Sequence, residues 1–241
     1  MGYERIVSRI CLVSFLFLLL QPSTLLQATF YGESPRPGLN QYPFKRGGYY
    51  VYLPSNYNQE HQYPLIVLSH IYMGEPELEP QELMESWIRL ADQRNYIVIL
   101  PIAGGDPRFT DAWYLDLLRT IRELYAIDQS RILLTGFGAG AHYALHLGAS
   151  YPDEFRAVSP VAGPIEGYWK QSTRFLKKNR PNFYFLSGAQ DHRVPSKEVQ
   201  QTVKMMDGMG YQVQFETLEG IDHSYSDEFT QKIADWFDKL D

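Results

Sequence analysis

The sequence predicts an α/β protein with a doubly wound, mostly parallel sheet and helices on both faces. Two observations predict it. Segments of strand length alternate with amphipathic segments of helix length, and several of the short segments are apolar throughout. Continuous apolar runs are typical of strands that are buried on both faces, as in parallel sheets. No repeat and no long linker divides the chain, so we expect one domain over residues 29–241.

The first expected elements follow a proline- and glycine-containing lead-in at residues 32–46. A strand is expected at residues 48–53, where aromatic and β-branched residues precede Pro54, and a buried strand at 63–69. The spacing of apolar residues predicts a helix at 81–93, and a second buried strand at 96–100 ends at Pro101. The remaining expected elements are helix 111–125, strand 131–135, helix 139–150, strands 155–161 and 182–186, helix 197–209, strand 211–218 and helix 226–240.

The N-terminus has the pattern of an export signal. Arg5 and Arg9 precede an apolar run at residues 10–20, and Ala28 ends a plausible cleavage site. We therefore expect a signal peptide at residues 1–28, a secreted or periplasmic protein, and no membrane span after cleavage; an uncleaved N-terminal membrane anchor is the alternative. Cys11 is the only cysteine and lies in this leader, so the mature chain has no disulfide, catalytic thiol or cysteine metal ligand.

Composition narrows the classes of partner. The net charge is −6, and no stripe of lysine and arginine occurs, which argues against nucleic acid binding. An acidic stretch with Glu75, Glu77 and Glu79 lacks the Asp-X-Asp spacing of a calcium loop. We expect neither a metal nor a cofactor.

Chemistry is expected where parallel strands end, at their carboxyl edge. Residues 135–140 have the frame of a Gly-X-Ser-X-Gly nucleophile elbow between a strand and a helix, but Gly138 stands at the serine position. Asp191 follows the strand at 182–186, and His223 follows the last strand. Elbow, acid and histidine come in the chain order of the α/β-hydrolases, which predicts a catalytic acid and base without the nucleophile.

The segment 127–163 resembles one branch of that superfamily. The residues that carry the resemblance are Ile127-Asp128 with Arg131, Thr135-Gly136-Phe137, Tyr151-Pro152 and Pro160-Val161-Ala162-Gly163. They are similar to the polyhydroxybutyrate depolymerases and feruloyl esterases, and a looser similarity extends from residue 48 to the C-terminus. The resemblance implies an α/β-hydrolase fold and a secreted carboxylic-ester hydrolase in which Asp191 orients His223. It also implies an oxyanion hole from the Ala139 amide and an amide near His70-Ile71.

The sequence departs from that branch at Gly138 and at residues 69–74, which lack the usual His-Gly form. Three interpretations stay open. The first interpretation, which we favour, is that the chain is a non-catalytic member that binds a small ester, a carboxylate, or an aryl or sugar ligand. Alternatively it is a weak hydrolase in which His223 and Asp191 activate water, or an active esterase in which Gly138 is an introduced substitution.

Aromatic side chains near the expected cleft suit either a ligand or the core. A small lid is best placed at residues 163–181, which include Tyr168 and Trp169. The other candidates are Tyr72, Trp113, Tyr114 and Tyr225.

Overall fold

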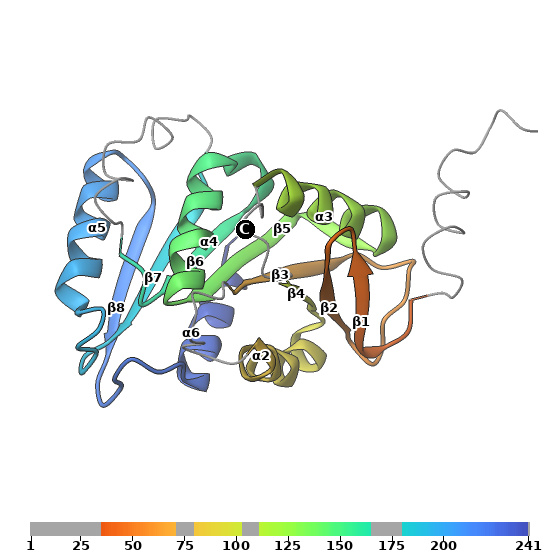
Figure 1. Cartoon of the computed structure of the whole chain (residues 1–241), viewed down its shortest axis with the longest axis horizontal. Coiled ribbons are helices and arrows are strands. Elements are labelled where there is room, and N and C mark those ends of the chain that lie inside the picture. Colours follow the sequence, from red (N-terminus) through yellow and green to blue (C-terminus); the bar gives the residue numbers. More distant parts are fainter. Residues whose placement is uncertain (1–34, 71–79, 103–110, 165–179, 241) are drawn as a thin grey trace, which may run out of the picture. The chain divides into compact units, whose positions relative to one another are not determined.

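Eight strands form one sheet in the computed structural model, which describes residues 35–70, 80–102, 111–164 and 180–240. The strand order is β1-β2-β4-β3-β5-β6-β7-β8 (Figure 1). β2 pairs antiparallel with β1 and β4, and all other neighbours pair in parallel. The predicted fold class is therefore confirmed. The predicted leader at residues 1–28 and most of the predicted lid lie outside the described residues.

The elements are β1 (Gly38–Phe44), β2 (Gly47–Leu53), β3 (Tyr63–Ser69), α2 (Pro80–Arg94), β4 (Ile97–Ile102), α3 (Asp111–Leu124), β5 (Ile127–Phe137), α4 (Ala139–Ser150), the short 3-10 helix η1 (Pro152–Glu154), β6 (Ala157–Val161), β7 (Asn182–Gly188), α5 (Ser196–Gly208), β8 (Val213–Leu218) and α6 (Asp227–Phe237). Most of them lie within a few residues of the expected ranges, and β3 and α4 have the expected bounds.

Strand β1 is the one strand of the sheet that the sequence did not predict. It lies in the segment taken as a lead-in and forms the edge of the sheet, paired only with β2. Leu39, Gln41 and Pro43 alternate as exposed positions along it. Proline is tolerated on an edge strand because one side of the strand makes no ladder hydrogen bonds. Because exposed positions alternate along this segment and it contains a proline, it lacks the apolar pattern from which a strand is predicted.

β5 is longer than the apolar run that predicted it. It begins at Ile127, which pairs with Tyr63, and the register shifts between Tyr63 and Leu65. The intervening polar residues bond locally, since the Asp128 carboxylate accepts from the Ser130 backbone N–H at 2.9 Å. The apolar pattern therefore identified only the buried half of this strand.

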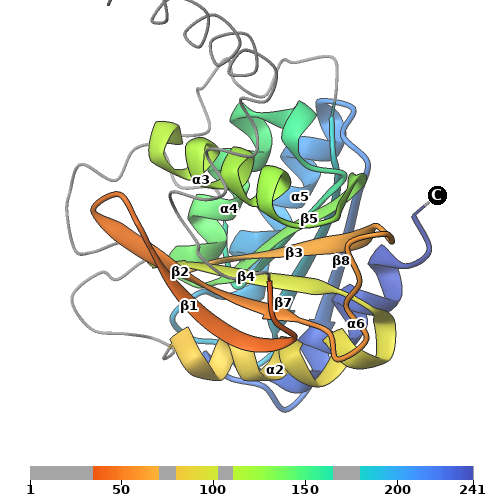
Figure 2. The same cartoon turned by 90° about the vertical axis from the view of Figure 1, so that its right-hand side faces the viewer.

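The two faces of the sheet carry separate cores. Leu65 and Val67 of β3 pack into the cluster beneath α3, α4 and α5, whereas Ile66 and Leu68 pack into the cluster beneath α2 and α6. Figure 2 shows α2 and α6 on one side of the sheet and α3 and α4 on the other. All four of these side chains are fully buried, and each contributes about 1.5 to 3 kcal/mol to folding. Burial on both faces explains why β3 is apolar throughout.

Candidate active site

The turn between β5 and α4 has an unusual backbone. Gly138 joins Phe137 to Ala139 with φ 53° and ψ −118°, a conformation that residues with a side chain rarely adopt. Its N–H donates to the Val161 carbonyl at 3.0 Å, and its carbonyl accepts from the His142 N–H at 3.2 Å. Hydrogen bonds to β6 and α4 thus hold a turn that glycine occupies without steric cost.

The glycines on either side are required by packing. A Cβ atom on Gly136 would lie 2.5 Å from the Ser69 carbonyl oxygen, and one on Gly140 would lie 2.1 Å from the same atom. Real Cβ atoms do not approach backbone oxygens this closely, so neither position accepts a side chain unless the backbone moves. The glycine frame recognised in the sequence therefore lets the start of α4 press against the end of β3.

Asp191 lies in the loop after β7 and is held by three hydrogen bonds. Its Oδ1 accepts from the backbone N–H groups of Arg193 at 3.0 Å and Val194 at 2.7 Å, and its Oδ2 lies 2.8 Å from His223 Nδ1. The Asp191 side chain is fully buried. A buried carboxylate needs such donors, because burial without them is costly.

His223 lies in the loop after β8, and a close backbone contact joins this loop to the one that carries Asp191. A Cβ on Gly188 would lie 2.4 Å from the Ile221 carbonyl, and the same carbonyl accepts from the Gln190 N–H at 2.9 Å. Because a carboxylate only accepts, we assign the His223 proton to Nδ1, which leaves Nε2 as the basic nitrogen. The predicted Asp191 and His223 thus form a pair.

The imidazole of His223 also contacts an aromatic ring at the β5–α4 turn. Its centroid lies 4.9 Å from that of Phe137, with the planes tilted by 41°. Since Phe137 directly precedes Gly138, this contact brings His223 to the turn. In the sequence motif Phe137 is only an unspecified X, so its role could not be read from the pattern.

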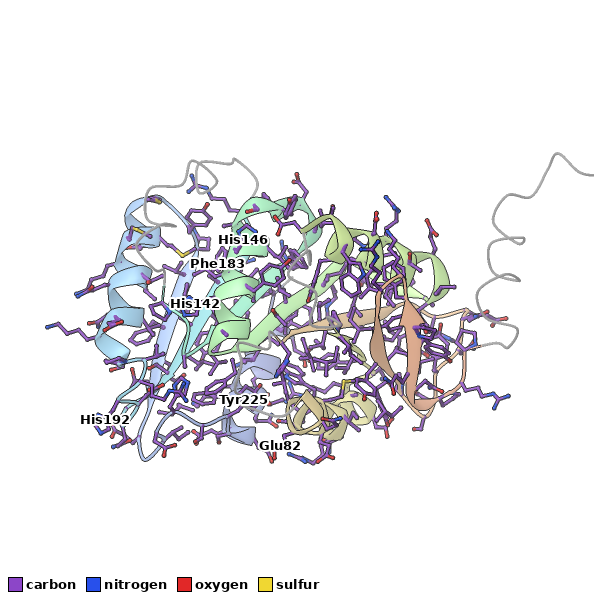
Figure 3. All side chains as sticks on the ribbon, viewed as in Figure 1. Glu82, His142, His146, Phe183, His192 and Tyr225 are labelled. Carbon is purple, nitrogen blue, oxygen red and sulfur yellow. The ribbon has the colours of Figure 1, made fainter. Side chains whose placement is uncertain are left out.

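Tyr225 packs against Phe137 on the side of the sheet that α2 and α6 cover (Figure 3). Its ring packs edge-on against Phe137 at 5.9 Å, and its hydroxyl accepts from Thr230 Oγ1 at 2.9 Å. Burial raises the pKa of Tyr225 to about 12. Tyr225 therefore belongs to the packing beneath the His223 loop.

The expected oxyanion donors are only partly described. Ala139 is the first residue of α4, where backbone N–H groups have no intrahelical acceptor and attract negative charge. His70 follows β3 and is half-buried. Ile71, the other half of the expected second donor, lies outside the described residues.

The other residues that the sequence analysis named as candidates are not part of the Asp191–His223 pair. Trp113 and Tyr114 are core residues, packed against Phe44 at 5.5 Å and Tyr143 at 5.7 Å. His192 and Asp222 are exposed. The candidates that lie outside the described residues are Tyr72, Glu75, Glu77, Glu79, Tyr168 and Trp169.

A second histidine–aspartate pair joins α3 to α4, and the sequence analysis missed it. His146 Nε2 lies 2.9 Å from both carboxylate oxygens of Asp111, and the Tyr151 hydroxyl donates to Oδ2 at 2.9 Å. Ser150 Oγ lies 3.4 Å from His146 Nδ1, so the imidazole of His146 lies between a serine hydroxyl and the Asp111 carboxylate. This serine lies at the carbonyl end of α4, where the helix dipole opposes an oxyanion. We therefore interpret this cluster, with His146 labelled in Figure 3, as structural.

Within the described ranges, no group of three or more histidine, cysteine, aspartate or glutamate residues is placed to hold a metal ion. Nor does this part of the chain contain a helix with both the length and the apolar character that crossing a membrane requires.

The strand order, the tight turn after β5 and the loops after β7 and β8 define an α/β-hydrolase fold. The solved ferulic acid esterase of Anaeromyces mucronatus superposes with a TM-score of 0.63 at 18% identity, over 86% of this chain and 90% of that one. The chain belongs to the phospholipase/carboxylesterase family, whose model matches residues 112–241. The predicted membership of the α/β-hydrolase superfamily is thus confirmed.

Two curated relatives are esterases. Feruloyl esterase D of Neurospora crassa is 27% identical over 183 residues, which are 63% of this chain and 60% of that protein. A bifunctional acetylxylan esterase/xylanase of Neocallimastix patriciarum is 26% identical over 136 residues, or 52% of this chain and 20% of that protein. The chain therefore spans from about a fifth to three fifths of their lengths.

Proposed function

We propose that this protein binds small carboxylic esters, or the acids derived from them, and lacks the covalent serine-hydrolase route because Gly138 occupies the nucleophile position. The observation that carries the proposal is the combination of a positive φ at Gly138 with a buried Asp191–His223 pair that contacts Phe137 at the same turn. A nucleophile elbow is a strained strand-to-helix turn of this kind. Glycine has no oxygen, so no acyl-enzyme forms there.

The ligand class follows from the relatives and from the chemistry of the turn. The relatives are named as feruloyl and acetylxylan esterases, which supports small acyl groups, including aromatic ones. The first turn of α4 offers backbone N–H groups to a carbonyl or carboxylate oxygen, and His223 lies at the same turn.

Restoring the missing oxygen tests this assignment. We expect Gly138→Ser to hydrolyse p-nitrophenyl acetate at least about 10²-fold faster than the wild-type protein, because a nucleophile beside a general base is regained. Gly138→Ala is the matched control, since it adds the Cβ without the hydroxyl and should gain nothing. A folded Gly138→Ser protein without this gain, or with a gain that survives His223→Gln, would contradict the assignment.

We further propose that residues 1–28 are an export signal that is cleaved after Ala28, which leaves a single domain. Intact mass spectrometry of the protein recovered from the host's extracytoplasmic fraction should give a chain that begins at Thr29. A full-length chain in the membrane fraction would instead support the anchor.

A further inference from the structure

Contacts with Asp191 and Phe137 hold His223 at this turn, although no serine is present there. We propose that the wild-type protein hydrolyses activated aryl esters slowly by direct attack of water, with His223 as the general base and without a covalent intermediate. The inference rests on the proposed function, because it uses the same turn and the same Asp191–His223 pair. It adds an activity to a site assigned so far only to binding.

Contacts on two sides fix the imidazole. His223 Nδ1 lies 2.8 Å from Asp191 Oδ2, and the ring packs against Phe137 at 4.9 Å. Only 7% of the His223 side chain is exposed. Neither contact involves residue 138, so the position of the base does not depend on a hydroxyl there.

Asp191 is fixed in turn by the backbone. Two N–H groups, from Arg193 and Val194, occupy one carboxylate oxygen and leave the other for the imidazole. When His223 takes a proton, the positive charge forms beside a buried carboxylate that needs no reorganisation. This is the supporting role that the acid plays in serine hydrolases, and it applies equally when the proton comes from water.

In this proposal the attacking water takes the place that a serine hydroxymethyl would fill, a group of similar volume to the about 30 Å³ of a water molecule. The water oxygen attacks the ester carbonyl carbon, the carbonyl π pair moves to oxygen, and a water proton passes to His223 Nε2. The Ala139 N–H, at the start of α4, is the expected donor to the oxyanion. Collapse reforms the carbonyl and breaks the bond to the phenol oxygen, which takes the proton from Nε2. The products are one carboxylic acid and one phenol.

The substrate class follows from the mechanism. Neutral water is a weaker nucleophile than a serine hydroxyl that is losing its proton to a base, so the ester carbonyl must be strongly electrophilic, as it is in activated aryl esters. Phenol leaving groups depart with little protonation, whereas alkyl alkoxides do not. We therefore expect turnover of aryl esters, with alkyl esters bound but hardly cleaved.

The first measurement is the hydrolysis of p-nitrophenyl acetate by the wild-type protein, His223→Gln and His192→Gln. His192 is exposed on the loop that carries Asp191 (Figure 3), so its substitution controls for non-specific reaction of a surface histidine. We expect His223→Gln to lower the rate at least about tenfold and His192→Gln to leave it unchanged. Equal rates for the wild type and a folded His223→Gln overturn the proposal.

The second measurement looks for the covalent intermediate. In rapid-quench experiments, the wild type should release p-nitrophenolate without a burst and should gain no acetyl group by intact mass. Gly138→Ser should show both, as a positive control. A burst and an acetyl adduct on the wild type overturn the water route. A folded Gly138→Ser that shows neither of them and also gains no turnover overturns the proposed function instead, so the two failures are distinguishable.

A third readout needs no substitution, in case the His223 variants fail to fold. The rate of the wild-type protein should level off at high pH instead of rising in proportion to hydroxide, because the attacking nucleophile is water assisted by a base of the protein. A rate that merely follows the hydroxide concentration overturns the proposal. His223→Phe keeps a ring against Phe137 and is a second variant for the comparison of rates, used only where circular dichroism shows that it folds.

Discussion

Adding a side chain at position 138 should destabilise the fold, even where the added side chain is the serine that we expect to support hydrolysis. Gly138 has φ 53°, where a Cβ atom is strained. Such backbone strain costs about 1 to 3 kcal/mol. Replacing glycine also lowers the conformational entropy of the unfolded chain, which stabilises the folded state by about 0.4 to 1 kcal/mol. We therefore expect Gly138→Ser to lower the free energy of unfolding by about 1 kcal/mol.

Two control variants separate strain from other effects. Gly138→Ala should cost about as much as Gly138→Ser, because the strain comes from the Cβ and not from the hydroxyl. Gly208→Ala places a Cβ at the end of α5, where no atom lies within 4 Å and φ is not positive. That variant should be neutral or more stable by up to about 1 kcal/mol.

The assay is urea unfolding, followed by tryptophan fluorescence and by circular dichroism. In a domain of this size, 1 kcal/mol corresponds to a change in Tm of about 2 to 4 °C. If both position-138 variants match or exceed the stability of the wild type, position 138 is not strained and the elbow interpretation loses its physical basis. If only Gly138→Ser is destabilised, the hydroxyl is responsible and not the backbone.

Three further predictions concern the polar contacts. Asp191→Asn should lower the free energy of unfolding by about 2 kcal/mol, because it weakens a buried acceptor of three hydrogen bonds. The control Asp222→Asn, at an exposed position, should change it by less than about 0.5 kcal/mol. Equal effects of the two substitutions in urea unfolding would refute this prediction. Asp111→Asn should cost about 1 to 3 kcal/mol in the same assay by weakening the α3–α4 cluster, with exposed Asp207→Asn as its control, and no loss would show that the cluster does not stabilise the fold. The pKa of Tyr225 is raised from 10.0 to about 12, so between these pH values the unfolded tyrosine releases its proton while the folded one keeps it, and stability falls by roughly 2 to 3 kcal/mol as pH rises. Tyr225→Phe should remove only this contribution from the slope of the stability–pH curve, because other tyrosines such as Tyr52 and Tyr96 also have raised pKa values. An unchanged slope would refute the assignment.

Short-range chemistry made the fold and much of the site predictable. The apolar runs of β3 and β4 are continuous because both faces of these strands are buried. The glycines at 136 and 140 are fixed by contact with the Ser69 carbonyl, which is why the frame around Gly138 survives as a recognisable pattern. Asp191 and His223 were found because each lies in a loop that follows a strand, at the same edge of the sheet.

Features that depend on how distant elements dock were not predictable. Asp111 and His146 meet only because α3 lies against α4, and nothing in either local sequence marks a partner 35 residues away. The contact between Phe137 and His223 likewise depends on the path of the loop after β8. β1 was missed for a different reason, since an exposed edge strand has little apolar pattern to detect.

The presence of Asp191 beside His223 is weak evidence for catalysis by itself. The carboxylate accepts two backbone N–H groups of the turn leading into α5, so the fold needs an acceptor at this position whether or not chemistry occurs. The same reasoning applies less to His223, whose ring could be replaced against Phe137 by another aromatic side chain. His223→Phe therefore separates the two roles: it keeps a ring against Phe137 but removes the donor to Asp191 Oδ2, so we expect it to cost about 1 to 3 kcal/mol of stability and to lose any histidine-dependent turnover. If His223→Phe instead keeps the turnover, the paired histidine serves only to fill the space beside Phe137 and to satisfy Asp191.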